Sequence, residues 1–194
     1  MATPRRPGQR AGLTHAAVLT AANELLAQHG VEAVTMRSLA QRLDVSPNAL
    51  YSHVASKTAL IDDMLDDLLA KVQTPDPQVD DPRAGLHGLM SSTYHLLLTH
   101  QDLVPLYLAR QGARGHNAQH LGEIMISLLA RAGVTGPPAR EALRVLIVYT
   151  IGFAAFATRG PIVPGGQPQP STQELNANFD SGIHWLLTGI GITG

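Results

Sequence analysis

The sequence of 194 residues contains no cysteine and few charged or aromatic side chains. Without thiols the chain can form neither disulfides nor thiolate metal sites, and a cysteine nucleophile is excluded. Charged residues make up only 15% of the chain and hydrophobic residues 44%, which argues against a disordered or nucleic-acid-coating protein. No apolar run of the signal-peptide type follows the N-terminal arginines, so we expect a cytoplasmic protein.

Motifs of the common catalytic sites are missing as well. The sequence has no nucleophile elbow, no phosphate-cradling glycine loop and no zinc-protease helix. His116 and His120 stand four residues apart, but no carboxylate or third histidine has a matching spacing, so a surface pair is expected. The four aspartates within residues 62–67 are interpreted as the solvated face of a helix. We therefore predict no enzymatic activity, no metal and no cofactor.

Apolar residues recur at spacings of three and four along most of the chain, and no segment alternates as a strand does. This periodicity predicts an all-α protein. The expected helices are 14–29, 36–43, 47–54, 57–72, 83–100, 103–110, 116–132, 138–159 and 173–190. The segment 138–159 is the most apolar, but only 14 uncharged residues separate Arg144 from Arg159, whereas a bilayer needs roughly 20. We interpret it as a helix buried in a soluble assembly.

Two short helical patterns separated by one tight break lie between residues 35 and 57. Asp44-Val45 interrupts the periodicity, and Ser46-Pro47 restarts it with an N-cap serine and a proline at the first helical position. The second helix would bury Leu50 and expose small or hydrogen-bonding residues, as a reader of the DNA major groove requires. An ordinary helical hairpin fits these 23 residues equally well.

The net charge of −1 is distributed unevenly. Residues 1–57 carry six Lys/Arg and three Asp/Glu, whereas residues 58–194 carry eight and twelve. The basic part therefore coincides with the two short helices, and its small excess suits a DNA reader that depends on a few placed phosphate contacts. Residues 1–12, with three arginines, are expected to be a disordered basic arm that either reaches DNA or is a solvated tail.

Residues 14–62 resemble the DNA-binding domain of the TetR family of bacterial transcriptional regulators. The positions that carry this resemblance are His29-Gly30, Val34-Thr35-Met36-Arg37, Leu39-Ala40, Leu43-Asp44-Val45-Ser46, Leu50-Tyr51-Ser52-His53-Val54 and Ser56-Lys57. Residues 179–190 are similar to the last helix of the subgroup that contains the tetracycline repressor. Residues 83–170 match no specific pattern.

The resemblance implies a homodimer that binds a palindromic operator and is released by a small-molecule effector, with repression as the expected outcome. The alternative is a helical DNA-binding protein without such a ligand, acting as an activator or an architectural protein. Four parts are then expected: the disordered arm 1–12, a helix-turn-helix domain 13–57, a connecting helix 58–73, and an effector-binding and dimerisation domain 74–194.

The resemblance also implies which residues contact DNA. Asn48 would read a base, because its amide can pair with adenine through two hydrogen bonds. Packing within the domain is the alternative role for Tyr51 and His53. Many family members carry glycine and threonine or serine at 48–49, so the operator sequence does not transfer. The predicted DNA-binding residues are Thr35, Arg37, Ser46, Pro47, Asn48, Ala49, Tyr51, Ser52, His53 and Lys57.

The effector pocket and the dimer interface are predicted on the later helices. The effector is expected to be largely apolar, held by apolar residues and a few polar anchors: Met90, Tyr94, His95, Tyr107, Arg110, His120, Met125, Tyr149 and Phe153. The last two helices of two copies would form a four-helix bundle through Leu143, Ile147, Ile151, Phe179, Ile183, Leu186 and Leu187.

Overall fold

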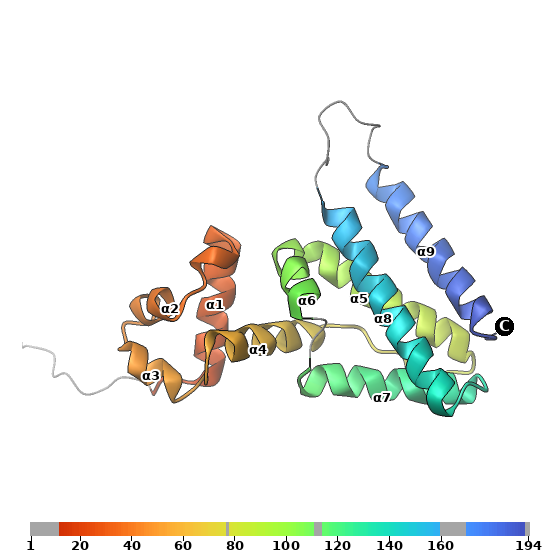
Figure 1. Ribbon diagram of the computed structural model, residues 1–194, viewed down its shortest axis with the longest axis horizontal. Helices are drawn as coiled ribbons and strands as arrows, with labels where there is room; N and C mark the ends of the chain where they lie inside the picture. The colour runs from red at the N-terminus through yellow and green to blue at the C-terminus, as the bar shows by residue number, and fades with distance from the viewer. Residues whose placement is uncertain (1–11, 77, 111–113, 160–169, 193–194) are drawn as a thin grey trace, which may run out of the picture. The chain divides into compact units, whose positions relative to one another are not determined.

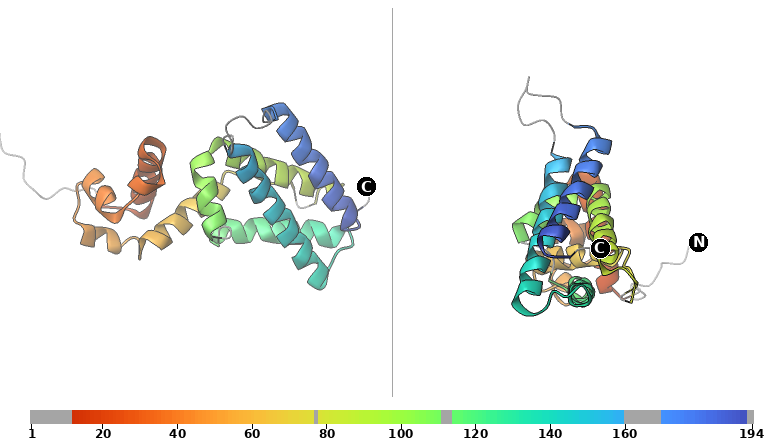
Figure 2. Two further views of the ribbon diagram at one scale, coloured as in Figure 1. Left: turned by 45° about the horizontal axis from the view of Figure 1, so that its top comes forward. Right: turned by 90° about the vertical axis from the view of Figure 1, so that its right-hand side faces the viewer.

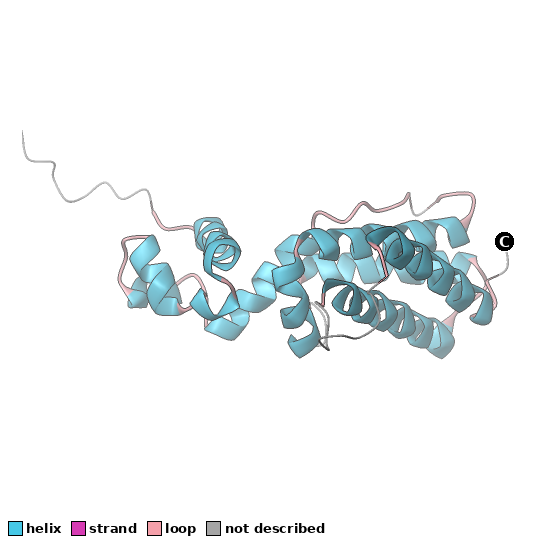
Figure 3. Cartoon of the chain, turned by 90° about the horizontal axis from the view of Figure 1, so that it is seen from above, coloured by secondary structure: helices cyan, strands magenta, loops and turns pink. Residues whose placement is uncertain are grey.

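The computed structural model describes residues 12–76, 78–110, 114–159 and 170–192. These residues form nine α-helices and two short 3₁₀ helices and contain no strand (Figures 1 and 3). The all-α prediction is therefore confirmed, with an N-terminal helix-turn-helix followed by a larger helical part. The chain divides into two compact units, residues 1–64 and 65–194, and the division falls inside helix α4, Lys57–Leu69.

The N-terminal unit contains four helices whose starts are fixed by hydroxyl side chains. The elements are α1 (His15–His29), η1 (Val31–Ala33), α2 (Met36–Arg42), α3 (Pro47–Tyr51) and the first part of α4. The hydroxyl oxygens of Thr14, Thr35, Ser46 and Ser56 each accept a backbone N–H of the first turn that follows. Such caps satisfy amide groups that have no partner inside the helix. Gly30, at φ +76°, ends α1 in a conformation that favours glycine.

The core of this unit is small and comes from the inner face of every helix. Its buried side chains include Val18, Ala22, Leu25, Leu26, Leu39, Leu50, Val54 and Leu60. Burying one leucine of this kind stabilises a fold by roughly 1.5–3 kcal/mol. The ion pair between Arg42 and Glu24, at 2.6 Å, adds a link between α2 and α1 at the surface.

The turn between α2 and α3 is as short as predicted. Asp44 adopts φ +51°, a left-handed conformation that aspartate tolerates better than most residues, and the N–H of Val45 then bonds back to Ala40. Helix α3 is shorter than the predicted 47–54, because it ends at Tyr51. Val54 lies in the turn that follows α3 and is nevertheless buried. Its N–H donates to the carbonyl of Leu50.

The C-terminal unit is a helical bundle built around α8. Its helices are the last part of α4, α5 (Pro82–Thr99), η2 (Gln101–Leu103), α6 (Val104–Arg110), α7 (His116–Arg131), α8 (Gly136–Thr158) and α9 (Thr172–Gly189). Helix α8 packs against α5, α6, α7 and α9 (Figure 2). By length and composition α8 passes the test for a membrane span, as a core helix of a bundle also does. Only 28% of this apolar window is buried within the chain, because α8 packs on its neighbours with one face and exposes Val148 and Phe156 on another.

Helices α8 and α9 approach closely at Gly182. A Cβ atom at Gly182 would overlap the hydroxyl of Tyr149, and this hydroxyl donates to the carbonyl of Phe179 at 3.1 Å. Around this contact the rings of Tyr94 and Phe179 stack with centroids 4.0 Å apart, and Phe153 meets both edge-on. Burial is the main cause that raises the pKa of Tyr94 and of Tyr149. This aromatic cluster fixes α9 against α5 and α8.

Candidate DNA interface and ligand pocket

The outward face of the helix-turn-helix is built by α3. Leu50 is fully buried and anchors the helix, whereas Ser46, Pro47 and Asn48 are exposed and Ala49 is partly exposed. No bulky side chain stands at the start of α3, so the backbone of this turn can approach a base edge closely. The exposed amide of Asn48 carries both a hydrogen-bond donor and an acceptor at this position.

Two cations and a phenol flank this surface. Arg37 and Lys57 are exposed and make no ion pair within residues 12–64, and Tyr51 is 53% exposed. Exposed cations and hydroxyls on either side of a recognition helix are typical of phosphate contacts, which position a protein on DNA. His53 lies at the edge of this surface and is partly buried.

The hydroxyl groups that are predicted to contact DNA already make hydrogen bonds to neighbouring residues of the protein. Thr35 and Ser38 cap α2 reciprocally, and the hydroxyl of Ser52 donates to the carbonyl of Ala49 at 2.7 Å. The oxygen of Ser46 accepts the N–H of Ala49 at 3.3 Å. These side chains therefore shape the turn, and any contact of theirs with DNA would use the remaining hydrogen-bonding capacity.

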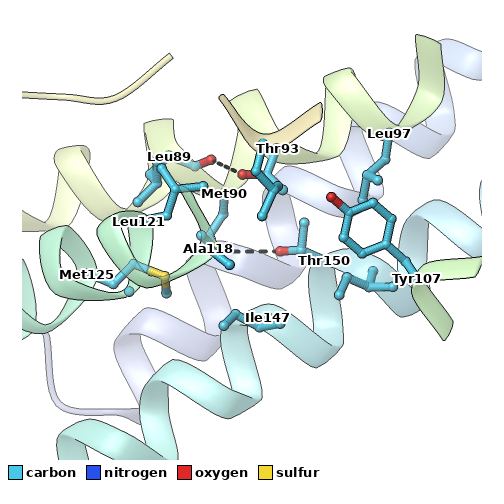
Figure 4. Close-up of a pocket in the computed structure, with 13 residues that line it drawn as sticks. Leu89, Met90, Thr93, Leu97, Tyr107, Ala118, Leu121, Met125, Ile147 and Thr150 are labelled. Carbon is cyan, nitrogen blue, oxygen red and sulfur yellow. Dashed lines mark hydrogen bonds between the residues drawn. The ribbon is translucent and has the colours of Figure 1, made fainter. Parts of the chain in front are cut away.

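The C-terminal unit contains a cavity of about 160 Å³ between α4, α5, α6, α7 and α8 (Figure 4). Most of its lining is aliphatic, as in many ligand sites. The lining residues are Leu69, Leu89, Met90, Thr93, Leu97, Tyr107, Ala118, Leu121, Gly122, Met125, Ile147, Thr150 and Ile151.

The structure brings only part of the predicted pocket together. Met90, Tyr107 and Met125 line the cavity. The other predicted aromatic residues, Tyr94, Tyr149 and Phe153, belong to the aromatic cluster, and the predicted polar anchors His95, Arg110 and His120 do not line the cavity. His95 and His120 are exposed. Sequence reasoning missed Thr93 and Thr150, because a threonine within a helix carries no signal of cavity lining.

Two contacts tie the cavity wall to α4. Tyr107 lines the cavity, and its hydroxyl donates to the carbonyl of Leu65 at 2.5 Å. Burial, with a smaller contribution from the Asp66 carboxylate, raises the pKa of Tyr107, so its hydroxyl keeps the proton that it donates. One turn further along α4, Leu69 itself lines the cavity.

Asp66 makes the second contact by capping the start of α7 from a distant part of the chain. Its carboxylate accepts the backbone N–H groups of Asn117 and Ala118 at 3.1 and 2.9 Å, and also the amide of Asn117 at 3.1 Å. Asp66 therefore has a structural role, and its interpretation as part of a purely solvated acidic face was wrong. The sequence held one clue, because Gly115, the N-cap residue of α7, has no side chain to provide this cap.

The predicted dimer interface requires a correction. Phe179, Ile183 and Leu187 are fully buried within a single chain, so in this conformation they cannot contact a second copy. Ile147 and Ile151 line the cavity, while Leu143 and Leu186 are partly exposed. The apolar stripes of α8 and α9 pack against their own bundle. Their periodicity in the sequence would be the same if they packed against a second copy of the chain.

Large apolar side chains are instead exposed on the opposite face of these two helices. Val145, Val148 and Phe156, at spacings of three and eight residues on α8, are 45%, 69% and 56% exposed. On α9, Trp185 is 71% exposed. We call these four residues the exposed α8/α9 face. Large exposed apolar side chains, aromatic ones above all, are typical of protein interfaces.

Comparison with known proteins decides the family. Residues 18–64 match the bacterial regulatory proteins of the tetR family, and residues 74–179 match the tetracyclin repressor-like C-terminal domain. The chain belongs to the TetR family. It is accordingly a ligand-responsive transcriptional regulator of the TetR type, and its relatives are regulators of transcription, not enzymes.

Individual TetR proteins are similar at moderate identity. The chain is 32% identical over 137 residues to the class A tetracycline repressor of transposon 1721 from Escherichia coli, a match that covers 70% of this chain and 62% of that protein. A structure of BioQ with its natural double-stranded DNA operator is 27% identical, has a TM-score of 0.71, and covers 92% of this chain and 98% of that one. A single-substitution variant of TetR from Acinetobacter baumannii AYE, solved in complex with minocycline, is also 27% identical, with a TM-score of 0.76 and coverages of 92% and 97%.

Proposed function

We propose that this TetR regulator is a repressor that binds a palindromic DNA operator as a homodimer and is released when a small molecule enters the cavity. The observation that carries the proposal is the cavity, because α4 supplies part of its wall and also continues as one helix to Lys57 at the helix-turn-helix. The cavity favours this function over a DNA-binding protein without a ligand.

DNA binding is supported by the surface around α3. Asn48 would read a base edge, while Arg37, Tyr51 and Lys57 would contact phosphates. The BioQ structure with its operator, which this chain resembles over nearly its whole length, shows that a related protein binds double-stranded DNA. The predicted residues Thr35, Ser46, Pro47, Ala49, Ser52 and His53 complete the proposed interface.

Dimerisation is supported by the exposed α8/α9 face. Two helices that each expose apolar residues would pack against the same helices of a second copy and form a four-helix bundle. A two-fold axis at this bundle would relate two helix-turn-helix units, and two-fold symmetry is what a palindromic operator requires.

Ligand release is supported by the two contacts that tie the cavity wall to α4. A ligand that displaces Tyr107 or the first turn of α7 would act on Leu65 and Asp66, the acceptors of these contacts. The operator affinity must then differ between the ligand-bound and ligand-free states, because allosteric coupling is a difference in binding free energy.

The first test is selection of bound fragments from the source genome by the native protein and by the double variant Arg37→Ala/Tyr51→Ala. We expect the native protein to recover one short palindrome and the double variant to lose it. Arg140→Ala serves as a control, since it removes an exposed arginine of the C-terminal unit. Recovery of the same random fragments by all three proteins, or of none by the native protein, would contradict the proposed function.

A further inference from the structure

Among the residues that the structure describes, none that lines the cavity carries a charged group. Its 13 lining residues include no Asp, Glu, Lys, Arg or His, and the only polar side chains among them are Thr93, Tyr107 and Thr150. A carboxylate, phosphate or ammonium group in this space would lose its hydration without gaining an ionic partner. The cost of burying an unpaired charge is large enough to exclude such ligands.

The three polar side chains present acceptors but not donors. Thr93 donates to the carbonyl of Leu89 at 2.8 Å (Figure 4), and Thr150 donates to the carbonyl of Leu146 at 2.9 Å. Tyr107 donates to Leu65, as described above. Each hydroxyl proton is therefore engaged within the protein, and each hydroxyl oxygen keeps lone pairs that can accept a hydrogen bond from a ligand.

The cavity is also small. An engineered apolar cavity of about 150 Å³ binds benzene, so a volume of about 160 Å³ accommodates about six to nine non-hydrogen atoms. Two of its walls carry methionines, Met90 and Met125, whose flexible side chains adapt to ligand shape.

A metal-chelate ligand does not fit the lining. The described lining offers no carboxylate or imidazole that could complete the coordination of a chelated divalent cation. Across the part of the chain that the structure describes, no group of three His, Cys, Asp or Glu side chains is arranged to hold a metal ion.

We propose that the effector is a small, uncharged molecule with a hydrocarbon body the size of a substituted benzene, bound without a metal. A single hydrogen-bond donor on it, such as a phenolic hydroxyl, would be accepted by Thr150 or Thr93. That this molecule acts as an effector rests on the proposed regulatory function. The chemistry of the ligand is inferred from the cavity alone.

The test uses three probes of nearly equal size on the full chain without DNA: toluene, p-cresol and benzoate. Binding is measured by calorimetry and by the shift in melting temperature. Toluene is expected to bind with a dissociation constant on the order of 0.1 mM, and p-cresol at least as tightly. Benzoate is expected to bind at least about 100-fold more weakly, because its carboxylate would be buried without a partner.

Two variants place the binding in this cavity. Ala118→Leu adds carbon atoms to the cavity wall and should weaken toluene binding at least about tenfold, since the added side chain occupies ligand volume. Its matched control is Ala130→Leu, the same substitution at an exposed position of α7 that does not line the cavity, and this variant should bind toluene as the native protein does. Circular dichroism verifies that both variants fold.

Thr150→Val keeps the volume of the side chain and removes the acceptor. It should leave toluene binding within about twofold and reduce p-cresol binding about fivefold to tenfold, the usual range for one hydrogen bond. If Ala118→Leu does not fold, Thr150→Val still tests whether the ligand binds in this cavity. Only a ligand next to Thr150 would lose p-cresol affinity while toluene affinity is kept.

Benzoate binding as tightly as toluene would overturn the proposal, as would failure of both neutral probes to bind. Equal binding of toluene by the native protein and by a folded Ala118→Leu variant would overturn the assignment to this cavity. None of these measurements contains DNA, so a failure of operator binding would leave their outcome unchanged. The two proposals therefore fail separately.

Discussion

The two units of this protein differ in how far apart in the sequence their functional residues lie. The candidate DNA surface comes from residues 35–57, and its caps and turn are contacts between near neighbours. The cavity is lined from residue 69 to residue 151 by five helices. A local surface can be recognised from a short motif, whereas a cavity depends on contacts between distant segments and can change its chemistry while the fold is kept.

The largest effect is expected from Leu50→Ala, which should destabilise the N-terminal unit but not the C-terminal unit. Leu50→Ala removes a fully buried side chain from the small N-terminal core and should cost about 2–5 kcal/mol in the free energy of unfolding. Since α3 is anchored by Leu50, operator binding should be lost as well. Thermal unfolding is followed by circular dichroism for the whole chain and by the fluorescence of Trp185, the single tryptophan, for the C-terminal unit.

Leu128→Ala is the matched variant, because Leu128 is equally buried in the C-terminal unit. It should shift the Trp185 transition, while Leu50→Ala should leave that transition in place. If Leu50→Ala lowered both transitions equally, the two units would unfold as one and the comparison between them would be incorrect.

The next effect concerns the exposed α8/α9 face. Trp185→Ala should weaken dimerisation by about 2 kcal/mol or more, because a large aromatic residue at an interface is a typical hot spot. Analytical ultracentrifugation measures the dissociation constant. Tyr51→Ala is the control, since it removes an exposed aromatic residue from the other unit and should leave the dimer intact. An unchanged dissociation constant for Trp185→Ala would show that dimers form elsewhere.

A smaller effect is expected where Asp66 caps α7. A Cβ atom at Gly115 would overlap the Asp66 carboxylate, so Gly115→Ala should cost about 1–3 kcal/mol through the lost hydrogen bonds. Gly88→Ala is the control, because a Cβ there meets no atom within 4 Å and alanine favours the helix. Chemical denaturation compares the two. A stability of Gly115→Ala equal to that of Gly88→Ala would show that the cap is dispensable.

The smallest effect is a dependence on pH within the C-terminal unit. Burial, and secondarily Lys71, lowers the pKa of His100, so the folded state favours the neutral imidazole. The stability that this contributes is present above the ordinary histidine pKa of about 6.5 and is lost as the pH falls through that value towards the lower folded pKa. Urea denaturation at pH 7.5 and 5.5 should therefore show a smaller loss of stability in His100→Gln than in the native protein. An identical loss in both would exclude His100 as the cause.

The sequence by itself determined the helices and the family. Nine helical segments were placed within a few residues of their observed ends, because caps such as Thr14 and Ser46, the glycine at 30 and the apolar periodicity act between residues close in the chain. The resemblance of residues 14–62 indicated the TetR family from the sequence alone, and the family match over residues 18–64 confirms it. The DNA contacts that it implies stay a prediction, as do the expected domain boundaries.

Only the tertiary structure decided which side of each helix meets which partner. Periodicity shows that Phe179 and Ile183 lie on an apolar stripe, but it does not distinguish a core within the chain from an interface between chains, and the buried positions proved to be core. In the same way Asp66 caps a helix that begins only at His116, and Thr150 enters the lining of a cavity. These roles depend on long-range packing, which local spacing along the sequence does not encode.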